Sequence, residues 1–357
     1  MFMEKALADF KKKPYKPEDD VNRWTDEFIK EWIVQKKILF VTNSLCQPGT
    51  HFLSALRTWI DYIPVHNFTL IYGLKNNNLY YGADVFNEIV VRTLSVGPYS
   101  KYDYVCYIDD DCYITDFEAL IKMLWQFIYD DCWCIAGPQD GGVFCHRNHS
   151  GMMINTFLSF WNLKAIREAG TLEEFITLRN RINANKGAEY KTFLDIINEK
   201  NPELLAQMTT ISNEHLTEMQ LRRQQRLPGG ESPYSAVVRN DPTNLVEPHQ
   251  TPYSCKDEAS NFEPYYLIEQ ALVLFTGKAI KYFDACDYMN RNPEISDDDV
   301  DNSGLSSAIY YYSQDFEDRL VAVHTWFSRM YTKWPSNNVQ LEHTKRINKI
   351  ISQFGKL

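Results

Sequence analysis

The feature that most constrains this chain is a hydrophobic segment that runs directly into three consecutive aspartates. Residues 104–108 are Tyr-Val-Cys-Tyr-Ile, and Asp109, Asp110 and Asp111 follow at once. An apolar run rich in β-branched and aromatic residues is typical of a strand buried on both faces of a sheet. Unpaired charges inside such a strand would cost a large free energy. We therefore expect the aspartates where the strand ends, which is where open α/β sheets bind ligands.

Carboxylates clustered at the end of a strand are suited to a hard divalent cation, most simply one that bridges to a phosphate. Because residues i and i+2 of a strand share a face, Asp109 and Asp111 are expected to bind one ion together. Asp110 then points away from the ion and is left for a second-shell or donor contact. The alternative interpretation of the triplet is a solvated acidic loop.

The composition is that of a folded protein with an acidic surface. The chain has 357 residues, 44% of them hydrophobic and 14% aromatic, and a formal net charge of −10. Its length allows one large domain or two modest ones. A general polyanion-binding protein would need a basic surface, so the charge argues against that class. It leaves room for a small anionic ligand that a metal and a few cations neutralise.

The eight cysteines include no pair of CxxC motifs, so no zinc site is predicted. Cys132 and Cys134 are expected to be ordinary core residues. The first residues, MFMEKALADFKKK, contain no apolar segment typical of a signal peptide, and no run approaches the ~18 residues of a membrane span. We therefore expect a soluble, cytoplasmic protein without a membrane span.

Hydrophobic periodicity and turn signals indicate an α/β fold with a mostly parallel, Rossmann-like sheet. No GxGxxG or P-loop motif occurs, so neither type of phosphate loop is indicated. The expected helices cover residues 20–35, 50–62, 115–129 and 304–312, with a polar one from about 337. The expected strands cover residues 38–41, 68–73, 89–91, 104–108, 133–137, 271–275 and 320–323.

The chain is expected to contain five parts. They are an N-terminal helical arm (1–35), the first part of the sheet domain (36–169), a helical insertion with a long loop (170–260), the remainder of the sheet domain (261–335) and a C-terminal helix (336–357). Long insertions of this kind are common sites of substrate selection.

A series of segments follows the order of motifs in a known group of enzymes. They are Tyr99-Ser100-Lys101, the strand with Asp109 to Asp111, Thr115 to Leu120, Ala136 to Asp140, His149 to Asn155, Asp301 to Leu305, and His324 with Lys333-Trp334. Together they resemble glycosyltransferases of the GT-A fold that carry a DxD motif, and are most similar to the glycogenin and galactosyltransferase group, family 8. The resemblance covers roughly residues 37–166 and 270–335. It implies a GT-A sheet domain into which residues 170–260 are inserted.

The resemblance also implies a set of metal ligands. By itself, a histidine that ends a buried strand, as His324 does, is more often a core residue. The family pattern makes it the third protein ligand, beside Asp109 and Asp111, of Mn²⁺ or Mg²⁺. Lys333 is then expected to neutralise the diphosphate of the donor as the sugar leaves.

Other residues are expected around the donor. Thr42 and Asn43 end the first strand and are placed to contact the nucleoside. By the resemblance, Lys101 contributes to donor binding, and Asp140 and Asp301 orient sugar hydroxyls.

The function implied is transfer of a hexosyl or pentosyl group from a nucleoside-diphosphate sugar, with UDP-sugar as the first expectation, and with retention of configuration. The acceptor is expected against residues 170–260 and stays open between protein, glycan, lipid and modified nucleic acid. Two alternatives also remain open. One is metal-dependent phosphoryl chemistry, as in a phosphatase or nucleotidyltransferase, although Tyr113 breaks the phosphatase pattern D-x-D-x-[TV]. The other is a sugar-binding protein of the same fold without catalysis.

Overall fold

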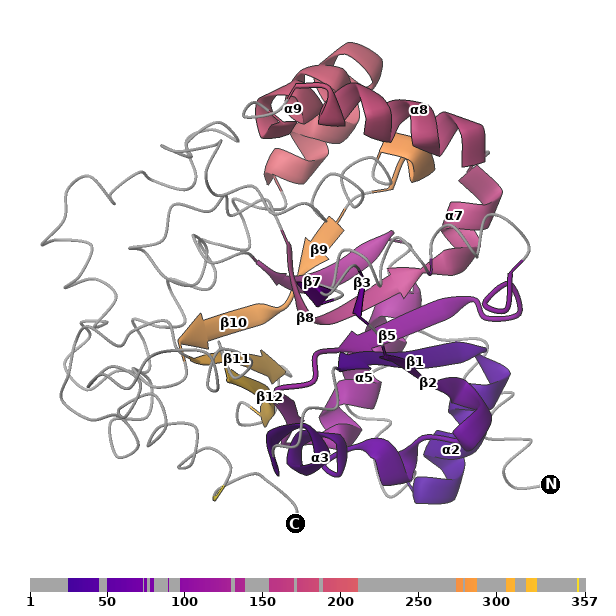
Figure 1. Cartoon of the computed structure of the whole chain (residues 1–357), viewed down its shortest axis with the longest axis vertical. Coiled ribbons are helices and arrows are strands. Elements are labelled where there is room, and N and C mark those ends of the chain that lie inside the picture. The colour runs from indigo at the N-terminus through magenta and orange to yellow at the C-terminus, as the bar shows by residue number, and fades with distance from the viewer. Residues whose placement is uncertain are drawn as a thin grey trace, which may run out of the picture.

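The structure is a computed structural model of the whole chain (Figure 1). It describes residues 25–44, 50–72, 74–75, 78–79, 89, 97–129, 132–138, 154–169, 172–185, 189–210, 274–278, 280–287, 306–311, 319–325 and 352.

A mixed sheet forms the centre of the described part of the chain. In spatial order its strands are β2 (Phe68–Tyr72), β1 (Ile38–Ser44), β5 (Tyr104–Ile108), β8 (Ile154–Asn162), β7 (Cys134–Pro138) and β9 (Ile280–Tyr282). The pairs β1–β2, β1–β5 and β7–β9 are parallel, whereas β8 is antiparallel to both of its neighbours. All of these strands except β8 therefore point the same way, as expected for a mostly parallel α/β sheet.

A second, antiparallel sheet lies beside the first. Its strands are, in order, β10 (Asp284–Asp287), β11 (Ser306–Tyr311), β12 (Arg319–Thr325) and β6 (Cys112–Ile114). The chain passes from the main sheet into this one twice, from β5 to β6 and from β9 to β10. A two-stranded hairpin, β3 (Leu74–Lys75) with β4 (Asn78–Leu79), is separate from both sheets.

Helices cover both faces of the main sheet, which makes a three-layer α/β/α arrangement. Figure 1 shows α7 (Leu163–Ala169), α8 (Leu172–Asn183) and α9 (Glu189–Lys200) on one side, and α2 (Asp26–Gln35), α3 (Thr50–Leu56) and α5 (Phe117–Tyr129) on the other. Residues 202–210 are also helical, and two short 3-10 helices cover Ile60–Tyr62 and Val65–Asn67.

The alternation of side chains along the strands explains the two covered faces. Leu39 and Tyr107 belong to a core cluster that includes residues of α7, α8 and α9. Phe40 and Cys106, each one position away, belong to a second cluster with residues of α2, α5 and β12. Since side chains of a strand point to opposite faces in turn, a strand that is apolar at every position buries both faces. The continuous hydrophobic runs of the sequence are thus accounted for.

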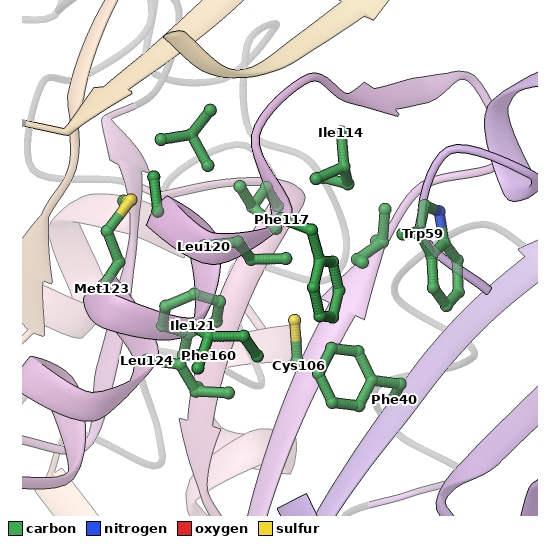
Figure 2. Packing of buried hydrophobic residues seen from close by; sticks show 14 of the residues in the cluster. Phe40, Trp59, Cys106, Ile114, Phe117, Leu120, Ile121, Met123, Leu124 and Phe160 are labelled. Carbon is green, nitrogen blue, oxygen red and sulfur yellow. The ribbon is translucent and has the colours of Figure 1, made fainter. Parts of the chain in front are cut away.

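Helix α5 contributes aromatic and aliphatic side chains to the second cluster and packs them on the sheet. Figure 2 shows Phe117, Leu120 and Leu124 of α5 pointing toward Phe40 and Cys106 of the strands. All five side chains are buried. At about 25 cal/mol per Å² of apolar surface removed from water, such packing is a main source of the stability of this layer.

Helix α2 is fixed at its start and along one face. The backbone N–H of Phe28 donates to the Thr25 hydroxyl at 3.2 Å, which is an N-cap. Trp32 is buried and stacks on Trp125 of α5, with the ring centroids 5.2 Å apart. The aromatic spacing in the sequence therefore predicted both the helix and its packing onto the domain.

Three secondary-structure predictions were wrong, because pairing partners distant in sequence or tight turns override local pattern. Residues 306–311, predicted as helix, form β11 between β10 and β12. Residues 274 and 275, at the end of the strand predicted over 271–275, instead form a helical turn with Thr276 before Gly277, whose φ of +65° suits glycine after a helix. Residues 271–273 of that predicted strand lie outside the described residues. Ile89, predicted to begin a strand over residues 89–91, is helical, whereas residues 90 and 91 lie outside the described residues. Strand β5 pairs directly with β1.

The predicted helix 50–62 ends earlier, as α3 ends at Leu56 and a turn follows. Helix α5 begins two residues later than its predicted cap at Thr115, because Asp116 accepts the hydrogen bond from the backbone of Ala119. Residues 172–183, 189–200 and 202–210 of the predicted insertion are helical, and its Leu194 and Leu204 pack in the same cluster as Leu39. Among the helices that the structure describes, none is long and apolar enough to cross a membrane.

Candidate metal centre

The three aspartates lie at the junction between the two sheets. Asp109 still continues the ladder of the main sheet, since its backbone N–H donates to the Phe157 carbonyl at 2.8 Å. The backbone N–H of Cys112 then donates to the Asp109 carbonyl at 3.1 Å, which closes a β-turn over residues 109–112. After this turn the chain enters β6 of the second sheet. A turn, rather than continued strand, therefore brings Asp109 and Asp111 to the same side.

The second sheet brings His324 to this turn. In the antiparallel pairing of β12 with β6, His324 lies opposite Cys112. The next residue, Thr325, donates to the Asp111 carbonyl from both its backbone N–H and its hydroxyl, each at 3.1 Å. Thr325 is fully buried. These two hydrogen bonds fix the backbone that carries Asp111 against the strand that carries His324.

Asp109, Asp111 and His324 form a compact group that could hold a metal ion. His324 Nε2 lies 2.8 Å from Asp111 Oδ1 and 3.8 Å from Asp109 Oδ2, and the potential ligand atoms all lie within 4.8 Å of one another. Asp111 and His324 are buried, with exposed fractions of 4% and 7%. Two carboxylates this close, one of them buried, are stabilised by a nearby positive charge, which a metal ion can supply.

These distances fit an octahedral cation. Bonds of about 2.1 Å place adjacent ligand atoms about 3.0 Å apart and opposite ones about 4.2 Å apart. The two oxygen-to-nitrogen distances, 2.8 and 3.8 Å, are close to this range. Two carboxylates and one imidazole suit a divalent ion of borderline hardness and leave positions open for an outside ligand. The predicted trio of metal ligands is thus assembled as a group, from parts of the chain more than two hundred residues apart.

Phe157 packs against the imidazole of this group. Its ring is stacked on that of His324, with the centroids 4.5 Å apart and the planes at 3°. Phe157 lies where β8 is irregular, because Ala136 pairs with Ser159 while the next residue of β7, Gly137, pairs with Asn155. Extra residues of this kind bend a strand and redirect its side chains, often beside active sites.

The two aspartates affect the pKa of neighbouring side chains. The pKa of the Cys112 thiol is raised well above its usual value by burial and then by the nearby carboxylates of Asp111 and Asp109. Burial and the charge of Asp111 likewise raise the pKa of Tyr113. Both groups therefore stay neutral at physiological pH.

The end of β1 reaches the same edge of the sheet. Since Val41 pairs with Tyr107 in the parallel register, Asn43 lies level with Asp109. Thr42 and Asn43 are both buried. Within the residues that the structure describes, the Thr42 hydroxyl has no hydrogen-bond partner. The structure therefore places both predicted nucleoside contacts at the edge where Asp109 lies.

The remaining predicted site residues are placed elsewhere or are not described. Asp110 is half-buried in the turn. Lys101 is exposed, with Nζ 4.9 Å from the centroid of the Tyr102 ring, and it precedes β5, at the end of that strand opposite to the aspartates. Asp140, Asp301 and Lys333 lie outside the described residues.

The sequence prediction did not include Tyr107, Phe157 or Thr325, all of which contact members of the candidate centre. Tyr107 could have been found, because it precedes Asp109 by two residues and shares its strand face. Thr325 directly follows His324, but its contact with Asp111 depends on the pairing of β12 with β6. Phe157 is placed by the irregularity of β8, for which we find no signal in the sequence.

Comparison with known proteins leaves the family of this chain open. No family model and no curated protein matches it. A solved structure titled "Crystal Structure of A197 from STIV" is similar, at 9% sequence identity and a TM-score of 0.26, over 38% of this chain and 69% of that chain.

Proposed function

We propose that this protein is a Mn²⁺- or Mg²⁺-dependent glycosyltransferase of the GT-A fold, which transfers a sugar from a nucleoside-diphosphate sugar to an acceptor with retention of configuration. A UDP-sugar is the donor we test first. The observation that carries the proposal is the convergence of Asp109, Asp111 and His324 at the carboxyl end of β5. The resemblance of the surrounding segments to family 8 supports it.

The charges of the site and of the donor favour a metal bridge. A diphosphate and the two close carboxylates of Asp109 and Asp111 repel each other, and the whole chain carries a net charge of −10. A divalent ion held by Asp109, Asp111 and His324 would neutralise the diphosphate and stabilise the charge that builds up as the sugar leaves. Lys333 is proposed to add a second positive charge.

The proposed nucleoside contacts are Thr42 and Asn43, because they end a parallel strand beside β5 at the ligand-binding edge. Asp140 and Asp301 are proposed to orient the hydroxyls of the transferred sugar. The acceptor is proposed to bind against the segment 170–260. These assignments follow the resemblance, and each can be tested by substitution.

Hydrolysis of the donor in the absence of an acceptor gives a direct test. The protein is incubated with a panel of UDP-, GDP- and CDP-sugars in Mn²⁺ or in EDTA, and the released nucleoside diphosphate is measured by mass spectrometry. We expect one donor to be cleaved only with metal, and Asp111→Asn to lower the rate by about 100-fold or more, as for other lost electrostatic contacts to a developing charge.

Asp61→Asn is the matched control, because Asp61 is an exposed carboxylate of a 3-10 helix and should leave the rate unchanged. Metal-dependent cleavage at the wild-type rate by Asp111→Asn would show that the proposed site is wrong. Release of phosphate from simple esters without donor cleavage would favour a phosphatase instead. Binding of a sugar nucleotide without turnover, in the presence or absence of acceptors, would favour a non-catalytic sugar-binding protein.

A further inference from the structure

Tyr107 connects two parts of the candidate site. Its hydroxyl lies 2.9 Å from Asp109 Oδ1 and also within hydrogen-bonding distance of Asn43 Oδ1. A phenol has a single hydrogen, so it can donate to one of these oxygens at a time. Tyr107 is 1% exposed, and Asn43 is 3% exposed. In so buried a place, a hydrogen bond to a carboxylate is stronger than the same bond in water.

The ring of Tyr107 is held independently of its hydroxyl. It stacks on Trp161, with the centroids 5.6 Å apart and the planes at 13°. The indole Nε1 of Trp161 donates in turn to the hydroxyl of Ser159 at 2.9 Å, and Ser159 pairs with Tyr107 across the ladder of β5 and β8. These contacts fix the position of the Tyr107 ring, and therefore of its hydroxyl beside Asp109.

The two oxygens of Asp109 have different surroundings. Oδ1 faces the Tyr107 hydroxyl, whereas Oδ2 lies 3.8 Å from His324 Nε2. A hydrogen bond to one carboxylate oxygen restricts rotation of the group and so decides which oxygen faces the other ligands. Partners of this kind, which orient a metal ligand without touching the metal, commonly change metal affinity by about 10- to 100-fold.

We propose that Tyr107 is a positioning residue, which turns Oδ2 of Asp109 toward the metal ion through its hydrogen bond to Oδ1. This inference rests on the metal site of the proposed function. The same hydroxyl also contacts Asn43, the proposed nucleoside contact, so Tyr107 joins the residue that holds the metal to the residue that holds the donor.

The test uses the full chain and Mn²⁺ alone, and measures free Mn²⁺ by electron paramagnetic resonance during a titration. Tyr107→Phe keeps the stacked ring and removes the hydroxyl, so we expect the affinity for Mn²⁺ to fall by about 10- to 100-fold. At saturating Mn²⁺, we also expect the spectrum of the bound ion to change, because one ligand is no longer fixed.

Tyr102→Phe is the matched control. Tyr102 is also buried, and its hydroxyl donates to the His66 carbonyl, before β5 and at the opposite end of that strand from the aspartates. Its loss should lower stability to urea to a similar extent and leave the affinity for Mn²⁺ unchanged. Urea unfolding of both variants separates an effect on the metal from a general loss of stability.

The outcomes are distinct. Wild-type affinity in Tyr107→Phe, or an equal loss of affinity in both variants, would overturn the proposal. If Tyr107→Phe does not fold, as judged by circular dichroism, the hydroxyl has a structural role and the proposal is also overturned. If the wild-type protein binds no Mn²⁺, the proposed function fails together with this inference, whereas normal Mn²⁺ binding by Tyr107→Phe leaves the proposed function standing.

Discussion

Burial controls the ionisation of single residues close to the candidate metal centre. Cys106 lies on β5 with its side chain inaccessible to solvent, and burial raises the pKa of its thiol well above the ordinary value. The thiol is neutral when protonated, so the folded state keeps this proton at a pH where the unfolded chain, with a pKa of about 8.5, has lost it. The stability that the buried, protonated Cys106 thiol contributes is therefore complete below about pH 8.5, and it is lost as the pH rises further.

We predict that the free energy of unfolding falls with pH above about 8.5, and that Cys106→Ala reduces this slope by about 1.4 kcal/mol per pH unit. Urea unfolding at pH 7.5, 9 and 10 under reducing conditions measures the slope. At pH 7.5 the Cys106 thiol is protonated in both states, so the difference in unfolding free energy between variant and wild type at this pH gives the loss of packing alone. Parallel pH curves for the variant and the wild type would refute the prediction.

The residues of the candidate centre differ in how far the sequence could predict them. Asp109 and Asp111 were predictable because a buried strand cannot contain them, and His324 because the resemblance pointed to it. Their approach to one another depends on a turn and on the pairing of β6 with β12, which local pattern does not encode. Phe157, which stacks on His324, depends on an irregular strand and was missed.

Among the elements, β12 is held to α5 by a charged contact that the sequence did not reveal. Arg319, at the start of β12, binds both carboxylate oxygens of Asp116 at 2.5 and 2.8 Å, and Asp116 also caps α5. A second contact joins Arg319 to Glu118 at 3.5 Å. Bidentate pairs of this kind fix geometry as well as adding energy. The contact thus helps to set the position of the strand that carries His324.

We predict that Arg319→Met lowers the free energy of unfolding by about 1–2 kcal/mol, because a partly buried, bidentate pair is lost. Arg181→Met is the control, since the pair of Arg181 with Glu199 is exposed and should contribute less than about 0.5 kcal/mol. Urea unfolding of the two variants tests the prediction. Equal, small effects would mean that Arg319 does not anchor β12.

Elements with strong local signals were predicted well, and those that depend on distant partners were not. The apolar runs of β1, β5, β7 and β12 and the periodic pattern of α2 identified these elements. Residues 306–311 have a composition compatible with helix or strand, and their place between β10 and β12 makes them a strand. The reversal of β8 within the parallel sheet likewise depends on pairing with both neighbours.

At the scale of the described fold, the turn from β5 to β6 is one of two places where the chain passes from the main sheet into the second sheet, and this junction carries the candidate metal centre. The main sheet supplies Asp109 and the end of β1, and the second sheet supplies His324. A nucleoside diphosphate bound at this junction would face carboxylates on an acidic protein. We therefore expect metal and nucleotide to bind together.

The most direct test measures Tm with UDP, GDP or CDP, in Mn²⁺ and in EDTA. A ligand at 100 times its Kd stabilises the folded state by about 2.7 kcal/mol, which corresponds to a rise of several degrees. We predict such a rise for one nucleoside diphosphate in Mn²⁺, none in EDTA, and none for His324→Ala under either condition. An equal rise in EDTA, or no rise with any of the three nucleotides in Mn²⁺, would contradict the account.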